Sequence, residues 1–201
     1  MNSKFYKRLA MVFTTILMFT FIASSQTTIN IKISNADDDC EEYLLAPGGD
    51  GVGFMDMTSG DLELTTESNG EPHIVGLIFR NVTIPAGATI TNAYVQFEVD
   101  ENETCVPNLT VLGAKIANMP APFTGAFFEI SSQPRTTATV AWSPGPWSIE
   151  HERGVNQQTP DIKTIIQEII GVSGWASGNN MMIMLTDPSE VECHQTVEAY
   201  D

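Results

Sequence analysis

The sequence contains little positive charge. Its 201 residues include 9 Lys and Arg against 25 Asp and Glu, which gives a formal net charge of −16 at pH 7. Binding to phosphate groups requires a basic face, so nucleic acid is a poor partner for this chain. The acidity is typical of a protein that stays dissolved outside the cell, and close carboxylates also suit a hard divalent cation such as calcium.

The sequence also has no hydrophobic run of the roughly 20 residues that a membrane-spanning helix needs. Its longest apolar stretch, residues 9–23, follows three basic residues and precedes small residues at 23–25. This order predicts a secretory signal over residues 1–25, with Gln26 as the mature start. A membrane anchor is the alternative, and the short apolar run disfavours it. Without the signal, 6 basic and 25 acidic residues remain, a net charge of −19.

No catalytic motif is recognisable. The chain shows no nucleophile elbow and no glycosidase signature, and His73, His151 and His194 lie far apart among ordinary neighbours. We therefore predict a protein that is not an enzyme, and a hydrolase is the least supported alternative.

Cysteine is scarce and its count is odd. Cys40, Cys105 and Cys193 predict one disulfide and one free thiol in an exported protein. Their spacing fits no zinc motif. The sequence does not decide the pair, although we favour a bridge to Cys193, because a terminal strand gains most from a covalent link.

Short alternating segments separated by turn residues dominate the rest of the chain. In residues 90–99, for example, Val95 and Phe97 share one face with Val99, whereas Tyr94 lies on the other. The absence of a βαβ rhythm predicts an all-β fold, an antiparallel β-sandwich. The predicted strands are residues 40–45, 61–65, 73–80, 90–99, 108–117, 136–142, 180–186 and 195–200.

One helix is predicted over residues 159–170. Thr159 is placed at its N-cap, Pro160 in its first turn and Gly171 at its end. An apolar stripe with helical spacing indicates that one side is buried in the core. The stripe consists of Ile162, Ile165, Ile166, Ile169 and Ile170.

The order of these segments resembles secreted bacterial β-sandwich modules, related to the jelly-roll DNRLRE domains and to carbohydrate-binding modules. The run Val82-Thr83-Ile84-Pro85-Ala86-Gly87-Ala88 is one matching piece. The others are residues 38–42, 59–64, 75–79, 89–97, 130–132, 140–142, 146–147, 158–162, 174–179 and 197–201. The resemblance implies a jelly-roll-like domain over residues 37–201, preceded by a short linker at 26–36. It also implies a non-catalytic role.

Five carboxylates are crowded into residues 37–42. In an extended chain Asp37, Asp39 and Glu41 share one face, and the family order suggests that the last strand brings Asp201 close. These four residues are our predicted metal ligands, with calcium as the expected ion. The alternative is a solvated strand edge whose charges prevent edge-to-edge pairing.

Aromatic side chains are the candidates for sugar stacking, because an apolar sugar face packs on an aromatic ring. Trp147 follows a Pro- and Gly-rich loop and is predicted to be exposed, whereas Trp142 and Trp175 are expected in the core. Tyr94 is the second predicted ligand contact, and Phe127 and Phe128 complete the exposed set.

These observations predict a secreted or cell-surface binding module for polysaccharide or another surface glycan. The alternative is a structural or adhesive module that assembles at the cell surface, with calcium as a stabiliser. In both cases we expect an extracellular glycan or a surface protein as partner, and no membrane insertion after the signal is removed.

Overall fold

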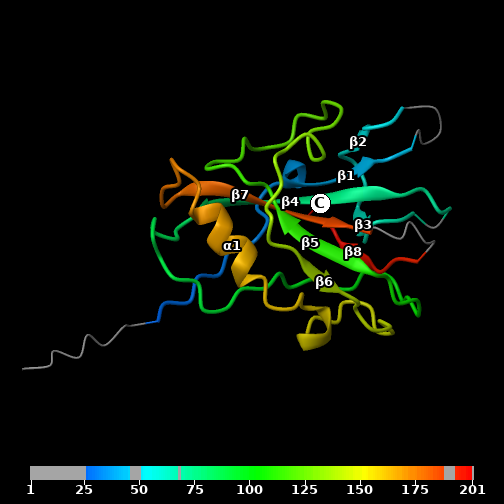
Figure 1. Cartoon of the computed structure of the whole chain (residues 1–201). Helices are drawn as coiled ribbons and strands as arrows, with labels where there is room; N and C mark the ends of the chain where they lie inside the picture. The colour runs from blue at the N-terminus through cyan, green and yellow to red at the C-terminus, as the bar shows by residue number, and fades with distance from the viewer. Residues whose placement is uncertain (1–25, 46–50, 68, 188–192, 201) are drawn as a thin grey trace, which may run out of the picture.

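The computed structural model describes residues 26–45, 51–67, 69–187 and 193–200 (Figure 1). The signal prediction for residues 1–25 and the predicted ligand Asp201 lie outside these ranges. The elements are η1 (Ala36–Asp38), β1 (Asp39–Tyr43), β2 (Met55–Asp56), β3 (Asp61–Glu63), β4 (His73–Val82), β5 (Leu109–Gly113), β6 (Val140–Trp142), η3 (Val155–Gln157), α1 (Lys163–Ile170), β7 (Asn179–Thr186) and β8 (Thr196–Glu198).

Six strands form one antiparallel sheet in the order β2-β1-β4-β7-β5-β6, and β3 pairs with β8 in a second, smaller sheet. The predicted all-β, sandwich-like fold with one helix is confirmed. The two central strands are apolar on both faces because both faces of the large sheet are covered. Odd-numbered residues such as Leu77 and Ile183 face the small sheet and α1. Even-numbered residues such as Ile78 and Met182 face the loop that carries Phe123.

Extended chain completes the layer that contains β3 and β8. Residues 90–99 alternate as predicted, with Val95, Phe97 and Val99 buried and the residues between them more exposed. They do not form a continuous β-strand, however. Within the described residues they pair through two isolated β-bridges, from Gln96 to Gln158 and from Val99 to Val197. The reason is that successive backbone groups on one edge bond to the loop at residues 157–162 instead of to a strand.

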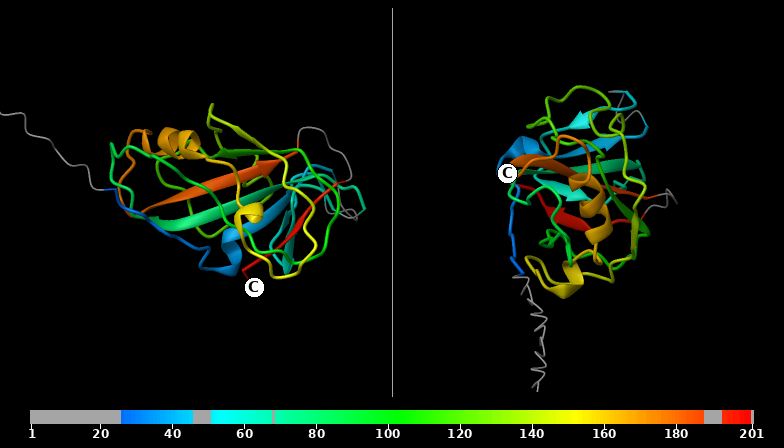
Figure 2. Two further views of the ribbon diagram at one scale, coloured as in Figure 1. Left: turned by 90° about the horizontal axis from the view of Figure 1, so that it is seen from below. Right: turned by 60° about the vertical axis from the view of Figure 1, so that its left-hand side comes forward.

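The segment predicted as a linker, residues 26–36, is part of the domain. It runs as extended chain along the outside of the sandwich to η1 (Figure 2). Ile31 and Ile33 pack against the main core, and the Gln26 side chain bonds to Thr91. The alternation of isoleucine with polar residues from Ile29 to Ile33 is itself a strand-like pattern, which fits this packing.

The helix has the predicted buried face but a later start. Ile165, Ile166, Ile169 and Ile170 are all buried, and α1 lies so close to the sheet that a Cβ on Gly113 would stand 2.6 Å from Ile169 Cδ1. Thr159 is not the N-cap, since the helix begins at Lys163. The Oγ1 of Thr159 accepts a hydrogen bond from the backbone N–H of Val95 at 3.0 Å instead. Tertiary pairing thus takes the capping side chain away from the helix.

Glu168 fastens α1 to the neighbouring loop. Its carboxylate accepts the backbone N–H groups of Thr137 and Ala138 at 2.9 and 2.8 Å and pairs with Lys115 Nζ at 2.9 Å. These hydrogen bonds, with the lysine, lower the pKa of Glu168 to about 2.

We expect Glu168→Gln to lower the free energy of unfolding at pH 7 by about 1–2 kcal/mol, since charge-assisted bonds weaken and part of the effect is screened. Because the folded-state pKa is depressed, this contribution is complete above the unfolded pKa of about 4.3 and fades as the pH falls toward 2. Urea denaturation at pH 7 and pH 2 measures the difference. The exposed Glu150→Gln variant is the control, and a Glu168→Gln difference that persists unchanged at pH 2 would contradict this account.

Candidate ligand-binding groove and buried acidic cluster

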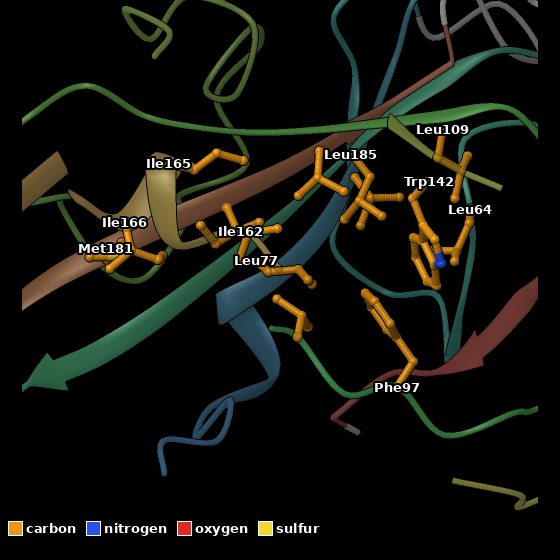
Figure 3. Close-up of a cluster of buried hydrophobic side chains, with 14 of the residues drawn as sticks. Leu64, Leu77, Phe97, Leu109, Trp142, Ile162, Ile165, Ile166, Met181 and Leu185 are labelled. Carbon is orange, nitrogen blue, oxygen red and sulfur yellow. The ribbon is translucent and has the colours of Figure 1, made fainter. Parts of the chain in front are cut away.

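A groove of about 1340 Å³ opens between the large sheet and the extended segments of the other layer. Its apolar floor includes Leu77, Ile162, Ile166 and Met181, whose side chains converge from β4, the start of the helical segment and β7 (Figure 3). Residues 26–33 and 88–98 form its sides.

The rim of the groove carries a row of polar side chains around one aromatic ring. Asn92, Tyr94 and Gln96 are exposed on the same face of extended chain, and Tyr94 is 50% exposed. The amide of Gln96 is fixed by bonds to the carbonyls of Phe97 and Gly154 and by the side chain of Gln158. Such a row presents an apolar ring between two amides.

The backbone along this row is also open. The N–H groups of Tyr94 and Gln96 donate to no group within the described ranges, because the paired edge of the segment is the opposite one, toward residues 157–162. On the open side the pairing with β8 ends at Glu198, whose N–H donates to the carbonyl of Glu98. Beyond that point the chain turns away, and the N–H of Tyr200 bonds to Asp39.

The predicted exposure of Trp147 is wrong. Only 1% of Trp147 is accessible, its indole N–H donates to the carbonyl of Asn156, and its ring packs beside Trp142. The loop folds inward because a large apolar ring gains more from the core than from solvent. Trp142 and Trp175 are buried as predicted. Tyr94 is thus the one predicted ligand residue whose side chain is available.

Phe127 and Phe128 form a separate exposed aromatic group. They are 50% and 43% exposed and pack edge to face, and Phe127 also contacts Phe54. Neither lines the groove. They therefore offer an internal comparison for any test of Tyr94.

The acidic residues 37–42 are neither a solvated edge nor one common site. Strand β1 is an inner strand, and four of these carboxylates are buried and held by different partners. Asp38 pairs with Arg80 through two bonds of 2.6 and 2.7 Å, and Asp39 accepts the N–H of Tyr200. The carboxylate of Glu42 accepts the backbone N–H groups of residues 130 and 131 at 2.7 and 2.8 Å.

The predicted calcium ligands are consequently not brought together within the described ranges. Asp37 lies half-buried in η1, and neither it nor Asp39 belongs to a described group of three metal-ligating side chains. Glu41 points to a different neighbourhood. Its Oε1 accepts the N–H of Glu63 at 2.8 Å and lies 3.3 Å from Nε2 of His73.

This neighbourhood is a buried acidic cluster of Glu41, Glu63, Glu67 and His73. Burial, and then the negative charge of Glu63, raises the pKa of Glu41 well above its usual value. Burial together with the charges of Glu67 and Asp61 raises the pKa of Glu63 to about 7. Burial lowers the pKa of His73. Without a bound cation, Glu41 and His73 are therefore driven toward their neutral forms.

Two more groups of possible ligands are only partly buried. Glu98, His151 and Glu198 meet near the groove, where Glu98 also pairs with Arg153 at 3.0 Å. Asp61, Asp100 and Glu101 form the other group. The charge of Glu198 adds to burial in raising the pKa of Asp100.

The cysteine prediction is confirmed. Cys105 and Cys193 form the disulfide, across 88 residues of sequence, and Cys40 is free and buried. Burial and the neighbouring Glu41 raise the pKa of the Cys40 thiol, which donates to the carbonyl of Asp56. A thiol of this kind is unreactive at neutral pH.

No protein-family model matches the chain, and no curated protein matches it either. The resemblance to DNRLRE and carbohydrate-binding modules stays a prediction. Among the described residues, no helix is long and apolar enough to cross a membrane.

Sequence reasoning missed Glu67 and His73 as members of the cluster. Glu41, Glu67 and His73 come from three separate segments, and no local spacing in the sequence links these positions. The antiparallel pairing of β1 with β4 brings Glu41 near His73, since it sets Tyr43 opposite His73. The bridge between Thr66 and Pro72 places the segment of Glu67 beside them. The row around Tyr94, in contrast, follows directly from its period of two.

Proposed function

We propose that this chain is a non-catalytic extracellular module that binds a glycan along the row of Asn92, Tyr94 and Gln96. The observation that carries this proposal is the half-exposed ring of Tyr94 between two exposed amides at the rim of a long groove. The resemblance to carbohydrate-binding modules points the same way. The disulfide fits an oxidising compartment outside the cytoplasm.

The chemistry of the row suits a sugar chain. Residues two apart on extended chain stand roughly 6.6–6.8 Å apart. This spacing lets one sugar ring stack on Tyr94 while its hydroxyls reach the Asn92 amide on one side and donate to the remaining lone pair of Gln96 Oε1 on the other. The Gln96 amide is already fixed by its neighbours, so little side-chain entropy is lost on binding. The Asn92 side chain has no hydrogen-bond partner among the described residues and is free to adapt.

Charge narrows the class of glycan. Glu98 and Glu198 stand at one end of the groove, and residues 26–201 carry a net charge of −19. An acidic polysaccharide would be repelled. We therefore propose a neutral glycan or one that carries amino groups.

We expect Tyr94→Ala to weaken glycan binding about tenfold, because one stacked ring contributes roughly 0.5–1.5 kcal/mol beyond its buried area. Gel retardation against a panel of neutral, amino-substituted and acidic polysaccharides measures this effect. Phe127→Ala removes an equally exposed ring away from the groove and is the matched control. Retardation that survives Tyr94→Ala but is lost in Phe127→Ala would refute the assignment, as would the absence of retardation on every glycan.

A structural or adhesive module is the second candidate, and the open backbone edge at Tyr94 and Gln96 favours it. Unpaired N–H groups beside an apolar groove can donate to the carbonyl groups of a strand added from another molecule. Light scattering after size-exclusion chromatography separates the two functions. Concentration-dependent oligomers without glycan retardation support assembly, and a monomer that is retarded supports glycan binding.

A further inference from the structure

The strongest unassigned feature is the place where the two sheets meet. Glu41 comes from β1, Glu67 follows β3, and His73 begins β4. One potential ligand atom from each of the three residues lies within 4.8 Å of the other two. His73 Nε2 and Glu41 Oε1 are 3.3 Å apart.

A second observation shows that this cluster is incomplete. Glu41 is 1% exposed, and its Oε2 is sealed from solvent with no hydrogen-bond partner among the described residues. An unsatisfied buried acceptor is destabilising, and more so when it is charged. No described Lys or Arg forms an ion pair with Glu41, Glu63 or Glu67, so the described residues give this cluster no permanent countercharge.

We propose that Glu41, Glu67 and His73 bind one divalent transition-metal ion of the zinc class. Calcium and magnesium prefer oxygen ligands alone, whereas one imidazole nitrogen with two carboxylates suits zinc. Tetrahedral bonds of about 2.0–2.1 Å place neighbouring ligand atoms about 3.3–3.4 Å apart. The pair formed by His73 and Glu41 already has this separation. Glu67, the third proposed ligand, is only partly buried.

Neighbouring groups hold the ligands in place. The Tyr43 hydroxyl donates to Glu67, and the N–H of Glu63 donates to Glu41 Oε1. Such outer contacts fix the orientation of metal ligands. Burial keeps His73 neutral at pH 7, the state in which imidazole binds a metal. In the ion-free protein the Nε2–H of His73 donates to the carbonyl of Glu63. A bound ion would take the place of that proton, which would be released to solvent.

An ion at this place would join three segments of the fold. It would link β1 and β4 of the large sheet to the chain that leaves β3 of the small sheet. The site goes beyond glycan binding, because Glu41, Glu67 and His73 do not line the groove. Metal binding and glycan binding can therefore fail independently.

The test is titration of Zn²⁺ into the exported, chelator-treated protein in competition with a chromophoric chelator, with Co²⁺ absorption as a second readout. We expect one ion per chain, visible Co²⁺ bands of tetrahedral intensity, and a higher melting temperature with Zn²⁺ than with chelator. His73→Ala and Glu67→Gln should each weaken binding at least about 100-fold, since both lose a direct ligand. His151→Ala, which removes the exposed histidine of another acidic group, should leave it unchanged.

Circular dichroism establishes that each variant is folded, and Glu67→Gln is the informative one if His73→Ala unfolds, because Glu67 is partly exposed. Three results would overturn the proposal. These are no stoichiometric Zn²⁺ binding by the folded wild type, undiminished binding in Glu67→Gln, or loss of binding in His151→Ala. Stabilisation by calcium but not by zinc would also contradict it.

Discussion

Replacing Cys105 and Cys193 together by serine is expected to lower the free energy of unfolding by about 4–5 kcal/mol. The bridge closes a loop across 88 residues, and the chain-entropy model assigns about 4.6 kcal/mol to a loop of that size. The disulfide also holds the chain just before β8. Within the described residues, the three residues of β8 pair with β3 and, through one isolated β-bridge, with Val99. Loss of the disulfide should therefore release the small sheet first.

Urea denaturation of the oxidised wild type and the double-serine variant measures this difference. Cys40→Ala is the control, since it removes a buried thiol without opening a loop and should cost no more than about 1–2 kcal/mol. A double-serine variant within about 1 kcal/mol of the wild type would show that the bridge is not structural.

Arg80→Ala is expected to destabilise the fold by about 3–5 kcal/mol. Asp38 is completely buried, and the guanidinium of Arg80 meets both of its carboxylate oxygens. Removing the arginine leaves a buried carboxylate without its countercharge, which is far more costly than the loss of a surface ion pair. The stability of Arg80→Lys should lie between those of the wild type and Arg80→Ala, because an ammonium group cannot reproduce the two parallel bonds.

Denaturation of four variants isolates this pair. Arg135→Ala, which removes an exposed arginine, should change stability by less than about 0.5 kcal/mol. Adding Asp38→Asn to Arg80→Ala should restore part of the loss, because the buried charge is then removed. Equal effects of Arg80→Ala and Arg135→Ala would contradict a structural role for the pair.

The spacing of apolar residues in the sequence correctly predicted which faces of the helix and of the segment around Tyr94 are buried. The buried stripe from Ile165 to Ile170 and the alternation around Tyr94 both survive in the structure, because each is set by which face meets the core. The helix start did not follow, since Thr159 bonds to the backbone of Val95, 64 residues away in sequence. A capping signal cannot reveal a competing partner at that distance.

The acidic segment shows the same limit more clearly. Carboxylates in a row suggest solvent or calcium, yet Asp38, Asp39 and Glu42 bond to Arg80, to Tyr200 and to the backbone of residues 130–131, respectively. Each partner lies at least 42 residues away. Trp147 was misplaced for a related reason, because the loop that carries it closes over the core instead of extending into solvent.

The most direct test of glycan binding through the Tyr94 row is a backbone-amide NMR titration of the exported protein with the polysaccharide fragment that retards it most. The account predicts saturable shifts concentrated at residues 92–96 and in the facing segment 26–33, and their loss in Tyr94→Ala. Saturable shifts centred on Phe127 and Phe128, with residues 92–96 unchanged, would contradict it.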